Sequence, residues 1–176
     1  MPQISLPAVQ LALQQVSDVA TGFNAALAIA APAYGVTPFQ INFSKTSPNF
    51  LIGRIDPKKL EASSSFTYPF MCLDTIRAED QARTISAVFG GRITIVFDVW
   101  VSSVGEEFPV SIAPQSYAVE DAMFAVLNNI QNLGRYQAAG FTYDGKWMLD
   151  KSLIIPAGDN WLQRSTFSNA FGLITN

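Results

Sequence analysis

The hydrophobic positions near the start of the chain follow a helical period. Over residues 6–30, apolar residues recur at alternating spacings of three and four, which places them on one stripe of a helix. Ser5 is suited to cap this helix, Pro7 fits its first turn, and Gly22 predicts a weak point midway. We expect the stripe to lie on the chain's own sheet, because a coiled-coil seam would need flanking charged pairs.

Beyond this helix the apolar period changes to the alternation of β-strands. Short strands are predicted over residues 39–43, 50–55 and 66–73. Pro69 confines the third to a sheet edge or a bulge. Cys72 falls inside the apolar run of that strand, which indicates a buried, inert thiol.

The clearest strand prediction is a long hairpin over residues 84–103. Gly90-Gly91 supplies the positive φ angles of a two-residue turn, and apolar residues then alternate with polar ones over residues 93–101. We place this strand at the centre of the fold and expect it to project beyond the sheet or curl around a helix. Trp100 lies on its more polar face, where it is either covered by a helix or held for a partner.

A second amphipathic helix is predicted after an irregular connection over residues 105–115. Ser116 is suited to cap it, and Gly134 is the expected stop. Phe124 falls off the buried stripe and is a candidate contact residue. The predicted buried stripe consists of Val119, Ala122, Met123, Val126, Leu127, Ile130 and Leu133.

Strands return in the last third of the chain. Asp144-Gly145 predicts a tight hairpin between residues 141–143 and 146–149, and a long strand or strand pair follows over residues 161–174. We therefore expect one α+β domain over residues 1–176. Its mostly antiparallel sheet, with the long central hairpin, packs against the N-terminal helix and the second amphipathic helix.

The composition indicates a chain that hides part of its surface against neighbours. Of its 176 residues, 49% are hydrophobic and only 14% are charged, which is too apolar for a typical soluble monomer. Polar residues interrupt the apolar stretch over residues 4–36, so we expect no membrane span. Since the first basic residue is Lys45, we also expect no signal peptide.

The charge balance argues against binding to nucleic-acid phosphates. The chain carries 11 Lys and Arg against 14 Asp and Glu, a net charge of −3. Proteins that grip nucleic acid normally carry the opposite sign, so no sequence-specific nucleic acid is expected as a partner.

The residue types exclude the commonest catalytic and metal sites. The sequence contains no histidine and one cysteine, Cys72, which removes Ser-His-Asp and Cys-His catalysis and the usual zinc sites. The acidic pair Glu106-Glu107 reads as an exposed turn. We therefore expect no enzyme activity, no cofactor and no metal.

The order of elements resembles the tail-terminator (tail completion) proteins of long-tailed bacteriophages. The resemblance is carried by the strand FGGRITIVFDVW over residues 89–100 and the helix VEDAMFAVL over residues 119–127. It implies a small structural subunit of the virion, assembled in the host cytoplasm. Such subunits form a homo-oligomeric ring, usually hexameric, which caps the tail tube protein and joins it to the head connector or adaptor protein.

Two other function classes stay open at this point. The chain is alternatively another neck, collar or tail component of a virion. In a different class, it is a small-ligand binding module in which Trp100, Trp147 and Trp161 line an apolar pocket. An enzyme is the third reading.

Ring contacts are expected where apolar residues lie in loops or off a buried stripe. The loops over residues 61–65 and 102–115 join strong elements yet contain few charges. The candidate interface residues are Trp100, Phe108, Val110, Ile112 and Phe124.

Phe108→Asp is predicted to weaken assembly and to leave the fold intact. A charge costs little in solvent and much at a desolvated interface. Light scattering should show a lower mass while circular dichroism stays unchanged on the same samples. A variant that unfolds would instead place Phe108 in the core.

Overall fold

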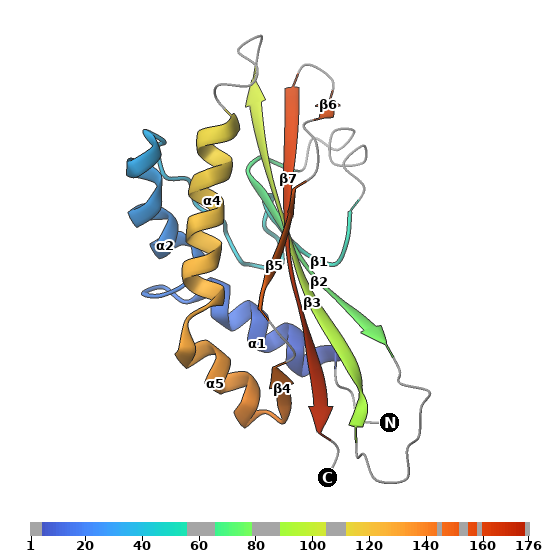
Figure 1. Ribbon diagram of the computed structural model, residues 1–176. Coiled ribbons are helices and arrows are strands. Elements are labelled where there is room, and N and C mark those ends of the chain that lie inside the picture. The colour runs from blue at the N-terminus through green and yellow to red at the C-terminus, as the bar shows by residue number, and fades with distance from the viewer. Residues whose placement is uncertain are drawn as a thin grey trace.

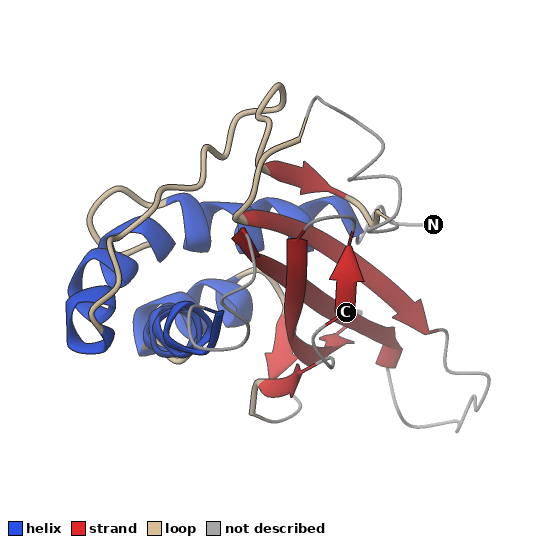
Figure 2. Cartoon of the chain, turned by 90° about the horizontal axis from the view of Figure 1, so that it is seen from above, coloured by secondary structure: helices blue, strands red, loops and turns tan. Residues whose placement is uncertain are grey.

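The helices lie in one layer on one face of a twisted sheet, so the fold class is α+β (Figure 1; Figure 2). The computed structural model describes residues 5–55, 66–78, 89–104, 112–143, 146–151, 155–157 and 160–174. The helices are α1 (Ser5–Ser17), α2 (Phe23–Ala30), the 3-10 helix η1 (Ala31–Tyr34), α4 (Ile112–Leu127) and α5 (Ile130–Ala138). The strands are β1 (Phe50–Ile52), β2 (Phe70–Ala78), β3 (Phe89–Val104), β4 (Phe141–Tyr143), β5 (Met148–Lys151), β6 (Ile155–Ala157) and β7 (Asn160–Ile174).

The seven-stranded sheet is mixed. Its order is β1-β2-β3-β7-β4, and β5 and β6 also pair with β7. Because β1 runs parallel to β2 while the other pairings described are antiparallel, the expectation of a mostly antiparallel sheet is corrected at this edge. The long central pair consists of β3 and β7, with 16 and 15 residues.

The prediction of a two-residue turn at Gly90-Gly91 is wrong. Both glycines lie inside β3, where the register against β7 shifts between Phe89 and Arg92, and Gly91 has a φ of 118°. A bulge needs the conformational freedom of glycine as much as a turn does, so the glycine pair could not distinguish the two. The partners of β3 are β2 and β7, and residues 84–88 of the predicted hairpin lie outside the described residues.

The N-terminal helical pattern belongs to two helices rather than one. Asp18 ends α1, because its Oδ1 accepts from the N–H groups of Ala20 and Thr21 at 2.9 and 2.8 Å. These hydrogen bonds hold the pKa of the Asp18 carboxyl below its usual value, and the bond from the Thr21 N–H has the largest effect. A Cβ atom at Gly22 would overlap the backbone of Asp18, so this tight connection requires glycine. The predicted stripe is also displaced, since Leu6 is 54% exposed and the small Ala8 and Ala12 are buried.

The second helix also ends earlier than its pattern predicts. It begins at Ile112 rather than at Ser116, and α5 starts at Ile130, so Gly134 lies inside α5. The break occurs because Asn129 caps α5, its side chain accepting from the Gln131 N–H at 2.9 Å. The predicted stripe is buried as far as Leu127, but Ile130 is 82% exposed.

Two further strand predictions are corrected. Residues 39–43 form no strand, because the backbone of Ile41 bonds to the side-chain amide of Asn24 instead of a neighbouring strand. Pro69 immediately precedes β2, which lies inside the sheet and not at its edge. The hairpin expected around Asp144-Gly145, a dipeptide outside the described residues, is replaced by pairing of both β4 and β5 with β7.

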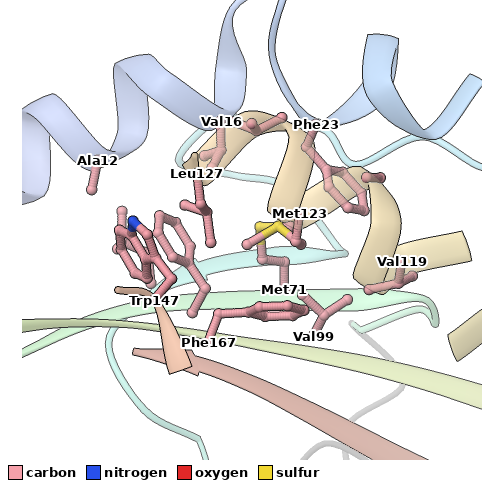
Figure 3. Packing of buried hydrophobic residues seen from close by; sticks show 14 of the residues in the cluster. Ala12, Val16, Phe23, Met71, Val99, Val119, Met123, Leu127, Trp147 and Phe167 are labelled. Carbon is pink, nitrogen blue, oxygen red and sulfur yellow. The ribbon is translucent and has the colours of Figure 1, made fainter. Parts of the chain in front are cut away.

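The main core lies between the helical layer and the sheet. In Figure 3, Val119, Met123 and Leu127 of α4 point toward Val99 of β3 and Phe167 of β7. This arrangement confirms the predicted packing of the second helix on the long strand. A buried polar link closes the layer: Gln15 donates to the Val126 carbonyl at 3.0 Å and accepts from the Tyr136 hydroxyl at 3.1 Å.

Leu127→Ala is expected to lower the free energy of unfolding by about 2–5 kcal/mol, because a fully buried side chain is removed and a cavity remains. Urea denaturation followed by circular dichroism measures the change. Ile130→Ala, on the exposed side of the same junction, is the matched control and should cost under about 1 kcal/mol. Equal effects of the two substitutions would contradict the assignment of the core.

Candidate functional site

The structure places three of the five predicted contact residues, and two of them contribute to the chain's own core. Trp100 is 3% exposed and Ile112 is fully buried. Phe124 is half-buried and packs edge-on against Phe167, with the ring centroids 5.5 Å apart. Phe108 and Val110 lie outside the described residues.

Trp100 is covered by strands and loops rather than by the predicted helix. It belongs to a second cluster, with Phe70, Cys72 and Leu162, on the sheet face away from the helices. The guanidinium carbon of Arg164 lies 5.4 Å from the Trp100 ring centroid. This face of the sheet therefore carries its own small core.

Beside the second cluster lies a polar cleft of about 280 Å³. Its floor is a cross-strand row of Asp98 on β3, Thr166 on β7 and Asp150 on β5. Arg164 and the segment around Arg54 complete the lining. The cleft thus combines two cations and two carboxylates from four separate parts of the sequence.

The buried carboxylate of the polar cleft is Asp98, which is 9% exposed. Its Oδ1 accepts a hydrogen bond from the Thr166 hydroxyl at 2.5 Å. Arg54 forms an ion pair with the neighbouring Asp74, with Nε and Oδ2 3.1 Å apart. Because the cleft offers both charge signs, it is suited to polar contacts with a partner.

The polar cleft was not predicted from the sequence. Asp98 shares the more polar face of the strand with Trp100, but its convergence with Asp150 and Arg54 depends on the cross-strand register. The available signal was that Asp98 is the one charged residue within residues 93–101.

A second polar cluster ties the sheet to the helices. Lys151 of β5 forms an ion pair with Glu120 of α4, and its ammonium lies 4.6 Å from the ring centroid of Tyr117. Next to this contact, the Tyr34 ring lies 6.0 Å from that of Tyr117, and the Tyr34 hydroxyl donates to Asp121 at 2.6 Å, which raises the pKa of that hydroxyl. Although β5 is a short outer strand, its end is therefore fixed to the helical layer.

The described residues offer little chemistry beyond these contacts. Desolvation, helped by the charge of Asp98, raises the pKa of the Cys72 thiol to about 12, so this cysteine stays protonated. Within the described ranges no cluster of three acidic or cysteine side chains is placed to hold a metal ion. None of the described helices has the length and apolarity needed to cross a membrane. Glu106-Glu107 lies outside these ranges.

The pocket proposed for a binding module would need Trp100 and Trp147 on the same side of the sheet, and the structure separates them. Trp100 and Trp147 belong to clusters on opposite faces of the sheet, and Trp147 contacts Phe97 and Phe171 in the main core. The polar cleft, a cavity of about 490 Å³ beside η1 and a groove of about 280 Å³ beside β1 contain no tryptophan. The expectation that the three tryptophans line one pocket is therefore wrong.

Comparison with known proteins adds no relative. No protein-family model matches the sequence, and no curated protein matches it either. The resemblance to tail-terminator proteins therefore stays a prediction from the sequence.

Thr166→Val should lower the free energy of unfolding by about 1–3 kcal/mol, because Asp98 loses its hydroxyl donor while it remains buried. Chemical denaturation at neutral pH measures the effect. Ser168→Ala removes a hydroxyl from the same face of β7, two residues away, and serves as the control with a change of at most about 0.5 kcal/mol. If Thr166→Val leaves the free energy of unfolding unchanged, other groups donate hydrogen bonds to Asp98 in its place.

Proposed function

We propose that the chain is a structural subunit of a tailed-phage virion that forms a homo-oligomeric ring, as a tail-terminator or tail-completion protein does. The proposed ring caps the tail tube and joins it to the head connector. The subunit is not an enzyme and uses no cofactor or metal.

The observation that carries this proposal is the one-sided covering of the sheet. All described helices lie on one face, whereas the described residues on the opposite face form the small cluster around Trp100 and the polar cleft. Both outer sides of the sheet are made of short strands, β1 at one side and β4, β5 and β6 at the other. In the proposed ring, this face and the two edges of short strands contact neighbouring chains.

Composition supports the same reading. A chain with 14% charged residues gains from burying further apolar surface against copies of itself. Its net charge of −3 suits a ring through which DNA passes. Another neck, collar or tail position in the virion uses the same features and is the second candidate.

The proposal predicts that the purified chain self-associates or caps tail tubes. Light scattering should give a defined mass several times that of the 19.2 kDa chain, and negative-stain electron microscopy should show rings. If a ring needs the tube end as a template, the rings should appear at the ends of tubes polymerised from the tail tube protein of the same phage. A chain that stays monomeric both alone and with those tubes would overturn the proposed function.

A further inference from the structure

We infer that neighbouring copies of the chain join edge to edge, with β1 of one copy pairing antiparallel with β5 of the next. The inference rests on the proposed ring role and names the contact that builds the ring. Three observations carry it: β1 has an outer edge that no described strand pairs with, β1 and β5 lie at the same position along the strands of the sheet, and they run in opposite directions.

Among the described strands, none pairs with the outer edge of β1. The Asn49 carbonyl and the Gly53 N–H both bond to β2, so the alternate residues Phe50 and Ile52 direct their N–H and C=O groups outward. Among the described residues, none bonds to those outward groups. Ile52 is 47% exposed, and the apolar groove of about 280 Å³ beside it is lined in part by Leu13 and Phe50.

β1 and β5 lie on opposite sides of the sheet and at the same position along the direction of its strands. The pairings across β2, β3 and β7 connect each residue of β1 to one residue of β5. Ile52 is thereby aligned with Leu149, Leu51 with Asp150, and Phe50 with Lys151. A neighbour placed beside the sheet at equal height would therefore continue each of these three rows directly.

The strand directions fit such a junction. β1 runs antiparallel to β3 and β5 runs parallel to it, so β1 and β5 point in opposite directions. Rotation about an axis along the strands preserves these directions, which makes the contact between neighbouring copies antiparallel. Because one edge meets a different edge, the contact is head-to-tail and can close into a ring.

The side chains at the proposed junction also match. On the helix-facing side the half-exposed Ile52 would lie beside Leu149 of the neighbouring copy. Lys151 holds the end of β5 against Glu120, so this edge is fixed before the neighbour arrives. An ordered edge loses less entropy on pairing than a free segment does.

Paired cysteine variants test the junction directly. Ile52→Cys and Leu149→Cys are purified separately, one with a larger tag, mixed and mildly oxidised. Directly opposed residues of an antiparallel pair have Cα atoms about 5 Å apart, which permits a disulfide. Cys72 is 2% exposed, so wild-type protein is the unreactive background. The mixture should give about tenfold more heterodimer than the control mixture, because the interface raises the effective concentration of the two thiols.

The control mixture combines Ile52→Cys with Met148→Cys. Met148 is one residue from Leu149 and 68% exposed, but it lies on the opposite face of the sheet. Ile52→Pro is a second variant, which removes an outward N–H and spares the bonds to β2. It should lower the mass measured by light scattering and leave circular dichroism unchanged.

Each other outcome overturns the inference and identifies the reason. Rings without the Ile52–Leu149 cross-link would show that the proposed function holds and that another surface joins the copies. A disulfide formed by Ile52→Cys with itself would indicate a twofold β1–β1 dimer. An Ile52→Cys monomer whose introduced thiol is protected from maleimide would mean that another segment covers β1. If the protein stays monomeric at every concentration and no cross-link forms, the edge contact is wrong. If it also stays monomeric in the presence of tail tubes, the proposed ring is wrong as well.

Discussion

The antiparallel pairing of β3 with β7 is the interaction on which the other elements depend. Its register extends from Phe89 opposite Ile174 to Val104 opposite Asn160, so it joins two segments far apart in sequence. On one side β3 carries β2 and, through it, β1; on the other side β7 carries β4, β5 and β6. Phe97 and Phe167 lie opposite each other on the helix-facing side of this pair, beneath the helices that complete the core.

Strict periodicity allowed much of this framework to be predicted from the sequence. The alternation over residues 93–101 and the helical stripe from Val119 to Leu127 both identify faces that are buried. The alternation near the C-terminus likewise identifies β7, with Phe167 and Phe171 fully buried. Each of these segments has one face in the main core, and that face imposes a regular apolar period on the sequence.

Local capping and long-range register explain what could not be predicted. Asp18 and Asn129 interrupt helical patterns whose apolar period continues past them, because a side-chain hydrogen bond decided where each helix ends or begins. The extended segment around Ile41 alternates like a strand but bonds to Asn24 and not to a neighbouring strand. The polar cleft required the register of three strands, which neither period nor composition contains.

The position of β7 in the sequence affects how the chain folds during synthesis. β4, β5 and β6 all precede β7 and all pair with it, so these three strands have no partner until residues 160–174 have been made. The ribosome releases the helices and β1 to β3 first, with one side of β3 still unpaired. Since pairing across long sequence separations is slow, the incomplete sheet is the state most exposed to aggregation. In the proposed β1–β5 contact, the same order delays the β5 edge until β7 is made, so that copies would not join through it during synthesis.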